Sequence, residues 1–472
     1  MTTLDQLADR LATLLGPRGF TQDPSVLAPR LEEWRGRHHG RTPFMIAPAT
    51  TADVAACVCA CAEAGVAITP QGGNTGLVGG QIPQGEALLS LHRMTAIRAV
   101  DPIDDALIVE AGAPLVRVQE AAAAVDRLFP LSLASQGSAT IGGLISTNAG
   151  GVHVLRYGMM RDLTLGLEAV LPNGEIFHGL KSLRKDNTGY DLKQLLIGAE
   201  GTLGIVTAAS LKLFPRPRGH EVALCAVDDA PRAIALLHHV KARTGAVSAF
   251  EIMNRESVAM TVRNVAGRRD PFPDAPFIAL IELESAQSAG LRALLEVTLT
   301  EALDAGLARD ALIAETERDA RAFWGLREDM SAGHKPEGAQ ISNDISVPVS
   351  AVARYLDEAE RAVRAVLPDA RIVAFGHAGD GNIHYTIVQA RGGDPAAFPR
   401  DAISDAVHET AVRLGGSISA EHGIGVARRA DFDRFKDPTA QALMRSLKRA
   451  LDPQGLMNPR ALLGPDARPD SV

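Results

Sequence analysis

The sequence has no excess of positive charge, no long apolar run and no targeting signal. The sequence has 48 Lys and Arg residues and 56 Asp and Glu residues, which give a net charge of −8. This overall charge does not indicate binding to nucleic acid or to an acidic membrane surface. No window approaches the roughly 18 consecutive apolar residues of a spanning helix. The N-terminus carries Asp5 and Asp9 in an amphipathic pattern, without the basic start and apolar run of a signal peptide. We therefore expect a cytoplasmic protein with no transmembrane segment, whose partners are small molecules or proteins and not nucleic acid.

The sequence contains only four cysteines, and three of them alternate along one short segment. Cys57, Cys59 and Cys61 lie in a stretch that Thr50 or Thr51 can cap, which predicts a helix. Alternate positions on a helix do not face one another. This spacing favours reduced structural thiols over a metal or redox site.

Two signatures of nucleotide binding are also missing. No Gly-x-Gly-x-x-Gly run opens a helix and no Gly-x-x-x-x-Gly-Lys-Ser/Thr run occurs, so NAD on a Rossmann fold and P-loop chemistry both lack their motif. Two glycine-rich loops are present instead, Pro70–Gly80 and Ser135–Gly151. Successive glycines let backbone N–H groups converge on a pyrophosphate, and Asn74 and Thr75 can add side-chain donors. Either loop alone is weak support, because loops need glycine anyway, but two of them favour a large cofactor.

The chain of 472 residues is too long for one compact core, and its pattern changes along its length. After an N-terminal helical segment, 1–43, apolar strands alternate with helices and glycine-rich loops over 44–215. Pro215-Arg-Pro-Arg-Gly219 is typical of an interdomain linker. Over 216–415, longer helices alternate with strands, which predicts a separate α+β sheet with helices on one side. Residues 416–472 form a C-terminal segment.

The run with the most chemical content is Gly376–Tyr385, in which two histidines share a glycine-rich turn. The stretch after it is typical of a strand, so the turn can bring His377 and His384 to one point. With Glu421 they would supply three nitrogen and oxygen ligands, the number that a catalytic Zn²⁺ site uses, and the neighbouring His422 would be free to act as a base. The alternative is that two of the thirteen histidines fall close together by chance, or are buried and satisfied by backbone carbonyls.

Seven motifs along nearly the whole chain match one family pattern in order. They are Gly72–Gly80, Thr147–Gly151, Leu183–Lys193, Gly201–Ile205, Gly376–Asn382, Ser419–Gly423 and Asn458–Pro459. Together they resemble the FAD-linked D-2-hydroxyacid dehydrogenases. The resemblance implies an α+β, two-domain flavoprotein, with an FAD-binding domain of the p-cresol methylhydroxylase (PCMH) type over 44–215. It further implies an α+β substrate domain over 216–415 and a C-terminal segment, 416–472, that returns to the FAD domain.

The resemblance also implies the ligands of the cofactors. A divalent metal, expected to be Zn²⁺, would be held by His377, His384 and Glu421, and His422 would be the catalytic base. The implied FAD contacts are Gly72, Gly73, Asn74, Thr75, Gly76, Ser138, Asn148, Ile205 and Asn458.

The implied reaction is the oxidation of a D-2-hydroxy acid to the 2-oxo acid. The metal would lower the pKa of the substrate hydroxyl by Lewis-acid polarisation, His422 would take that proton, and hydride would leave C2 for flavin N5. Arg327 would bind a substrate carboxylate as a bidentate fork, with Ser331 one helical turn on, and Asn382 would contact substrate. Without the family, a solvated surface arginine is the better interpretation of Arg327.

The choice of substrate depends on a departure from the family pattern. Relatives that act on D-2-hydroxyglutarate carry a lysine for the distal carboxylate just before Asp344, where this chain has Ser342 and Asn343. The resemblance still favours D-2-hydroxyglutarate, oxidised to 2-oxoglutarate, with Lys335 as a replacement for that lysine. D-lactate, glycolate or D-malate is the alternative.

The resemblance implies an acceptor other than NAD: an electron-transfer flavoprotein, a cytochrome or a quinone. A homodimer is expected from base rates. Two rival functions stay open, namely an electron-transfer or regulatory subunit without turnover, and a flavin oxidase that works without metal. Loss of His422 or of a metal ligand would mark the first rival, and all of these residues are intact.

Overall fold

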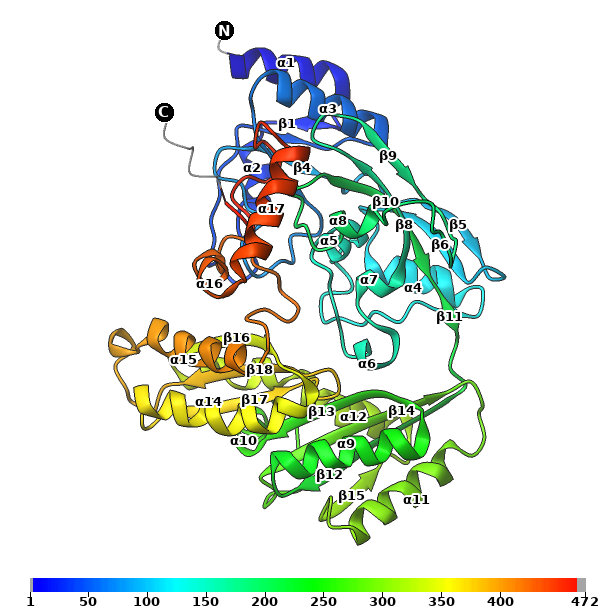
Figure 1. Cartoon of the computed structure of the whole chain (residues 1–472), viewed down its shortest axis with the longest axis vertical. Helices are drawn as coiled ribbons and strands as arrows, with labels where there is room; N and C mark the ends of the chain where they lie inside the picture. Colours follow the sequence, from blue (N-terminus) through cyan, green and yellow to red (C-terminus); the bar gives the residue numbers. More distant parts are fainter. Residues whose placement is uncertain (1–2, 465–472) are drawn as a thin grey trace. The chain divides into compact units, whose positions relative to one another are not determined.

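The computed structural model describes residues 3–464 and divides into two compact units (Figure 1). Unit 1 is formed by Met1–Gly151, Gly158–Arg216 and Glu421–Val472, and unit 2 by Val152–Tyr157 and Pro217–Ala420. Among the described residues, no helix is long and apolar enough to cross a membrane.

Unit 1 contains two main sheets. The first has the strand order β1-β2-β4-β3, with β4 parallel to both β2 and β3. The second is antiparallel throughout, in the order β5-β6-β10-β8-β9. A short pair, β7 and β11, lies outside both. The strands are β1 (Phe20–Thr21), β2 (Met45–Ile46), β3 (Ile68–Gln71), β4 (Ala87–Ser90), β5 (Ile97–Asp101), β6 (Ala106–Glu110), β7 (Arg127–Leu128), β8 (Thr164–Val170), β9 (Ile176–Gly179), β10 (Ile205–Lys212) and β11 (Phe214–Pro215).

The helices of unit 1 include the one predicted around the cysteines. They are α1 (Thr3–Leu15), α2 (Pro24–Leu27), η1 (Ala28–Arg30), α3 (Thr51–Glu63), α4 (Leu115–Ala123), α5 (Ile141–Ser146), α7 (Met160–Leu163), α8 (Lys193–Leu196), α16 (Arg429–Phe435) and α17 (Pro438–Leu451). Helix α3 begins with a capping box between Thr50 and Asp53. Burial raises the pKa of the Cys57 and Cys61 thiols to about 12, and all four cysteines are free. The predicted helix around Cys57, Cys59 and Cys61 is confirmed, and none of the three is in a disulfide.

Unit 2 is built on one seven-stranded antiparallel sheet in the order β15-β12-β14-β13-β17-β18-β16. Its strands are β12 (Gly219–Val227), β13 (Val247–Asn254), β14 (Phe277–Ser285), β15 (Asp310–Ile313), β16 (Gln340–Ser346), β17 (Arg371–Gly376) and β18 (Asn382–Val388). Its helices are α6 (Val154–Tyr157), α9 (Ala230–Thr244), α10 (Arg255–Asn264), α11 (Leu291–Asp304), α12 (Glu317–Glu328), α13 (Met330–Gly333), η2 (Lys335–Glu337), η3 (Val349–Ala351), α14 (Val352–Val366), η4 (Pro395–Ala397) and α15 (Arg400–Arg413).

Helices cover both faces of this sheet, which corrects the expectation of helices on one side. Helices α9, α11, α14 and α15 pack on one face, while α10, α12 and α13 pack on the other. Strand β14 shows why two layers are needed, since it sends Ile281 into the first apolar cluster and Leu280 into the second. A strand that is apolar on both faces must be buried on both.

The second face also holds a buried carboxylate network. Glu282 on β14 is only 4% exposed, and it accepts hydrogen bonds from Ser248 Oγ (2.7 Å) and Trp324 Nε1 (2.8 Å). The Nε2 atoms of His153 and His220 lie 2.8 and 3.0 Å from its two oxygens. Burial opposes the charged form of Glu282, but the hydrogen bonds from both histidines outweigh it and hold the pKa of this carboxyl well below its usual range. The network therefore anchors the segment around α6 within unit 2.

Candidate functional site

The glycine-rich loop of unit 1 follows β3 directly and packs against the residues before α5. A Cβ on Gly72 would lie 2.2 Å from Thr140 Oγ1, and a Cβ on Gly73 would lie 1.8 Å from the Ser138 carbonyl oxygen. Only glycine fits at these two positions. The two glycine-rich stretches that the sequence shows separately thus form one cradle of closely packed backbone.

Two buried oxygens beside this loop have no hydrogen-bond partner among the described residues. They are Gln71 Oε1 and Thr140 Oγ1, on side chains of residues that are 2% and 7% exposed. A buried polar atom without a partner costs about 1–3 kcal/mol, so this pair indicates a polar ligand in the cradle. The Thr140 hydroxyl can donate to a phosphate oxygen, and Gln71 Oε1 can accept from a hydroxyl or an amine. The donor set therefore fits a dinucleotide cofactor such as FAD.

Neither Gln71 nor Thr140 is among the FAD contacts predicted from the sequence. The available signal was the position of Thr140, a hydroxyl in a run of small residues immediately before a helix.

Three of the predicted FAD contacts are asparagines in the left-handed backbone region. The φ angles of Asn74, Asn148 and Asn458 are 56°, 49° and 39°, a conformation that Asn tolerates better than most residues. Their side chains form hydrogen bonds with the protein's own backbone. Asn74 Nδ2 donates to the Glu32 carbonyl oxygen (2.9 Å), and Asn148 Oδ1 accepts from the Arg161 N–H (2.9 Å). Asn458 Nδ2 donates to the carbonyl oxygens of Gly80 (3.0 Å) and Glu200 (2.7 Å). These hydrogen bonds give the asparagines a part in shaping the loops of the cradle.

The remaining predicted contacts lie in the same unit. Thr75 and Gly76 continue the loop and are half-buried, and Ser138 is exposed beside Gly73. Ile205 is buried as the first residue of β10. Their contact with FAD stays a prediction.

In unit 2, a tight turn between β17 and β18 brings the two predicted metal-binding histidines together. The ring centroids of His377 and His384 lie 5.5 Å apart at an interplanar angle of 77°. Gly381 makes this turn possible, because its φ is +89° and a Cβ there would lie 2.0 Å from the Val347 carbonyl oxygen. The predicted loop followed by a strand is confirmed, with β18 carrying His384.

Glu421 is the third predicted ligand and follows Ala420, the last residue of unit 2. The Ala420 N–H donates to the Asp344 carbonyl oxygen at 3.2 Å, and Asp344 pairs with His384 in the sheet register. One ligand atom from each of His377, His384 and Glu421 lies within 4.8 Å of the others. Two imidazoles and a carboxylate fit Zn²⁺ or a similar divalent cation. His422, the predicted base, comes next and is half-buried.

A fully buried carboxylate, that of Glu251 on β13, supports this turn. Its Oε1 lies 2.6 Å from His377 Nδ1, and its Oε2 accepts a hydrogen bond of 2.6 Å from Arg327 Nε. Burial opposes the charged form of Glu251, but its electrostatic interactions and hydrogen bonds with His377 and Arg327 outweigh burial and lower the pKa of Glu251 to about 2. The sequence contains no local signal for this role, since Glu251 stands alone in an apolar strand, far along the chain from both partners.

Arg327 is 7% exposed, which excludes the interpretation as a solvated surface residue. It lies in the last turn of α12, with its guanidinium 4.8 Å from the centroid of the Phe375 ring. The helix ends at Glu328, so Ser331 belongs to the following short helix α13, where it is exposed.

Asn382, the predicted substrate contact, begins β18 and is 5% exposed. Its Nδ2 donates to Asp344 Oδ1 and to the Ile345 carbonyl oxygen, both at 2.9 Å. Its Oδ1 is buried and has no partner among the described residues, so it is available to a ligand. Nearby in the turn, burial raises the pKa of Asp380 to about 6.

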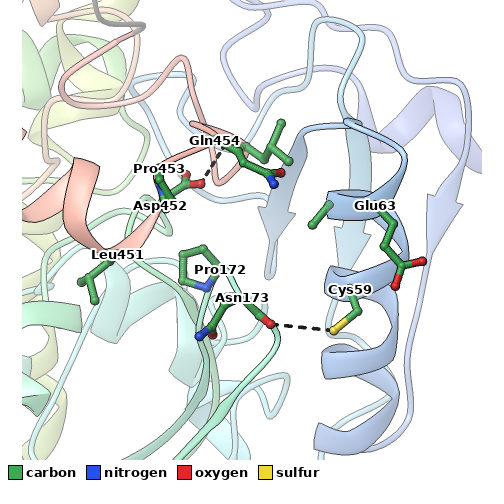
Figure 2. A pocket seen from close by; sticks show the side chains of 10 residues that line it. Cys59, Glu63, Pro172, Asn173, Leu451, Asp452, Pro453 and Gln454 are labelled. Carbon is green, nitrogen blue, oxygen red and sulfur yellow. Dashed lines mark hydrogen bonds between the residues drawn. The ribbon is translucent and has the colours of Figure 1, made fainter.

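Two other features lie apart from these residues. His153, Glu282 and Glu284 also place ligand-type atoms within 4.8 Å of one another, but the oxygens of Glu282 are already engaged by the network described above. A groove of about 320 Å³ in unit 1 is lined by the end of α3, the turn between β8 and β9, residues 451–454 and Leu456 (Figure 2). Its two carboxylates are engaged, Glu63 by Arg10 and Asp452 by Lys448. No predicted site residue lines it.

Comparison with known proteins accounts for both units. Residues 42–179 match the model of an FAD binding domain, and residues 216–462 match that of the C-terminal domain of FAD linked oxidases. The mitochondrial D-2-hydroxyglutarate dehydrogenase of Arabidopsis thaliana is 36% identical, over 95% of this chain and 80% of the relative. That of Bos taurus is also 36% identical, over 96% and 83%. The chain belongs to the FAD-linked oxidase family.

Because it belongs to this family, the protein is an FAD-dependent oxidoreductase. The predicted family and the predicted cofactor FAD are thereby confirmed. The fold class is confirmed as well. The solved structure of p-cresol methylhydroxylase with substrate bound has a TM-score of 0.75 at 16% identity, over 97% of this chain and 96% of that one. A 4-ethylphenol oxidase from Gulosibacter chungangensis has a TM-score of 0.72 at 17% identity, over 98% of both chains.

One expectation is overturned by the same comparison. The predicted cytoplasmic location is wrong, because the relatives from Arabidopsis thaliana, Bos taurus and Danio rerio are named as mitochondrial proteins and point to the mitochondrion.

The cradle geometry leads to a prediction for flavin binding. Gly73→Ala is expected to lower the FAD content of the purified FAD-linked oxidase at least about tenfold, because its Cβ would displace the Ser138 backbone that forms the cradle. The ratio of flavin to protein absorbance measures this. Gly137→Ala is the matched control, since a Cβ there meets nothing within 4 Å. Equal flavin content in both variants would contradict the role of the Gly73 loop.

Proposed function

We propose that this FAD-linked oxidase is a metal-dependent D-2-hydroxyacid dehydrogenase whose substrate is D-2-hydroxyglutarate, oxidised to 2-oxoglutarate. The observation that carries the proposal is the pair of buried groups joined by Glu251: a histidine of metal-ligand type, His377, and an arginine able to bind a carboxylate, Arg327. A 2-hydroxy acid offers a hydroxyl and carboxylate to a metal, and a dicarboxylic one offers a second carboxylate. The names of the relatives from Arabidopsis thaliana and Bos taurus agree with this substrate.

We assign the flavin to the region 44–215 with the return of residues 416–472, and the substrate to the region 216–415. Gly72, Gly73 and Thr75 would form the pyrophosphate side of the FAD site, with Asn74, Asn148 and Asn458 holding its loops in shape. Gly76, Ser138 and Ile205 complete the proposed contacts.

Bound FAD would supply the acceptor for hydride from C2, and a bound divalent cation, proposed to be Zn²⁺, would supply Lewis acidity at the substrate hydroxyl. His377, His384 and Glu421 are proposed to hold the cation. His422 is proposed to take the proton that leaves the substrate hydroxyl, so that the oxidation releases one hydride and one proton.

The substrate itself is proposed to be held by three polar groups. Arg327 presents a guanidinium fork to a carboxylate, and Asn382 presents its unpartnered Oδ1. Ser331, on α13, would contribute from the exposed side of the site. The electron acceptor is proposed to be an electron-transfer flavoprotein, a cytochrome or a quinone, and the protein a homodimer.

A smaller 2-hydroxy acid such as D-lactate is the second candidate, and one observation favours it. Asn343, at the position before Asp344, faces the side of the sheet that α15 covers. Its Nδ2 donates to the Tyr385 carbonyl oxygen on β18, and its Oδ1 accepts from the Ser404 hydroxyl on α15. Ser342, on the same face as Asp344, has its hydroxyl 3.0 Å from Thr386 Oγ1. Neither residue offers a cation to a distal carboxylate.

A stopped-flow screen of flavin bleaching under anaerobic conditions tests the proposal. We expect D-2-hydroxyglutarate to reduce the flavin with the largest second-order rate constant among D-2-hydroxyglutarate, D-malate, D-lactate and glycolate. The L-enantiomers are expected to be at least about 100-fold slower, because a metal, an arginine and a base fix the position of C2. Faster reduction by D-lactate or glycolate would select the second candidate, and no reduction by any of the acids would reject the proposed function.

A further inference from the structure

Glu251 is a fully buried carboxylate in the middle of the unit 2 sheet. It is 0% exposed and lies on β13, between β14 and β17. Its chain neighbours Phe250 and Ile252 belong to the apolar core. An ionised carboxylate is stable in such surroundings only when it is paired and hydrogen-bonded, so the partners of its two oxygens define its role.

Each oxygen of Glu251 binds a different element of the fold. Oε1 lies 2.6 Å from His377 Nδ1, in the turn after β17, and Oε2 lies 2.6 Å from Arg327 Nε, in the last turn of α12. These partners are the histidine proposed to bind the metal and the arginine proposed to bind the substrate carboxylate. One carboxylate therefore holds a group of each kind.

The hydrogen bond to Nδ1 determines which nitrogen of His377 can bind a cation. When Nδ1–H donates to the carboxylate, the ring's lone pair lies on Nε2. A carboxylate that accepts from a metal-binding histidine also fixes the orientation of the ring and raises its basicity. Glu251 thus selects the tautomer and ring position of His377 in which Nε2 carries the lone pair that a cation can bind.

The hydrogen bond to Nε similarly determines which edge of Arg327 is available. Glu251 takes the Nε position, and Phe375 lies against the guanidinium, 4.8 Å from its centre. Among the described residues, Glu251 is the only hydrogen-bond partner of the Arg327 guanidinium. The terminal nitrogens Nη1 and Nη2 are left to form a bidentate pair with a ligand carboxylate.

We propose that Glu251 is a positioning residue that prepares His377 for metal binding and Arg327 for substrate binding at the same time. The inference rests on the proposed function and deepens it, because it makes metal affinity and substrate affinity depend on one buried side chain. Substitution of Glu251 should then weaken both, although it touches neither ligand.

The test is the zinc affinity of the metal-depleted, FAD-loaded protein, measured by competition with a chromophoric chelator. In Glu251→Gln the amide oxygen can accept from only one of the two donors, and its NH₂ group faces the other. We expect the zinc dissociation constant to rise about 10- to 100-fold. At saturating zinc, we expect the KM for the hydroxy acid to rise as well, because Arg327 loses its fixed orientation.

Glu282→Gln is the matched control. It removes another buried carboxylate, on the neighbouring strand β14, and the partners of Glu282 do not include His377 or Arg327. We expect it to lower thermal stability and to leave the zinc dissociation constant within about threefold of the wild type. A loss of zinc affinity as large as that of Glu251→Gln would show that general destabilisation is the cause, and would overturn the proposal.

Glu251→Asp covers the case in which Glu251→Gln does not fold. It keeps the buried charge, but the side chain is one methylene shorter and cannot reach both partners. A folded Glu251→Asp or Glu251→Gln protein with wild-type zinc affinity and KM would overturn the proposal. A wild-type protein that binds no zinc is a different result, because it would reject the proposed metal site itself and this inference with it.

Discussion

His422→Asn is expected to slow flavin reduction by the hydroxy acid about 1,000-fold, within the 10²- to 10⁴-fold range typical of a lost general base. The asparagine side chain has a similar size but cannot accept a proton near neutral pH. FAD content and zinc affinity are expected to stay at wild-type values, since His422 is assigned to neither cofactor. Stopped-flow reduction at saturating substrate measures the effect.

The pH dependence of this rate separates a base from a structural residue. In the wild type, the rate is expected to level off above the pKa of the base. In His422→Asn, it is expected to keep rising by about one order of magnitude per pH unit, because hydroxide must replace the imidazole. A variant that reduces its flavin at the normal rate, or one that keeps the wild-type plateau, would place the base elsewhere.

Removal of the proposed metal is expected to lower flavin reduction at least about 100-fold, because the Lewis acidity that a bound cation would supply at the substrate hydroxyl is worth several kcal/mol and each 1.4 kcal/mol is a factor of ten. Dialysis against a chelator followed by an activity assay tests this, and added Zn²⁺ should restore the rate. The visible flavin absorbance should persist throughout, because the proposed FAD contacts lie in unit 1 and the two histidines proposed as metal ligands lie in unit 2.

His384→Ala is the matching substitution and is expected to give the same loss, together with weaker zinc binding. His239→Ala is its control, because His239 is a half-buried histidine of unit 2 on α9 whose Nε2 faces the Thr298 carbonyl oxygen. Full activity after complete removal of the metal would instead support a flavin oxidase that works without metal.

Local features of the fold could be predicted wherever the signal lies in neighbouring residues. Thr50 and Asp53 form the capping box of α3, and the glycines of the run from Gly376 predict a turn before the strand that carries His384. The second helical layer on the unit 2 sheet could not be predicted in this way. Which side a helix covers depends on the twist and order of strands that are distant in sequence, such as β13 and β17.

The residues of the candidate site likewise fall into those that short motifs predict and those that only contacts between distant segments define. The residue types of His377, His384, Glu421 and His422 stand close together in two short motifs, so chemistry and spacing make them visible in the sequence. Glu251 is not visible in this way, because it lies 126 positions from His377 and 76 positions from Arg327 in the sequence. The position of Thr140 in the site could not be predicted for a related reason, since its hydroxyl lies against Gly72, which belongs to another loop.

The sequence by itself therefore determined the family, the flavin cofactor and the identity of the candidate metal ligands, because these depend on short motifs of particular residue types. Only the tertiary structure decided that Arg327 is buried, that Asn343 points away from the site, and that Glu251 joins Arg327 to His377. The physical reason is that burial and hydrogen-bond partners arise when separate strands and helices pack together. Which partners a buried charge meets is fixed by that packing and not by its neighbours in the chain.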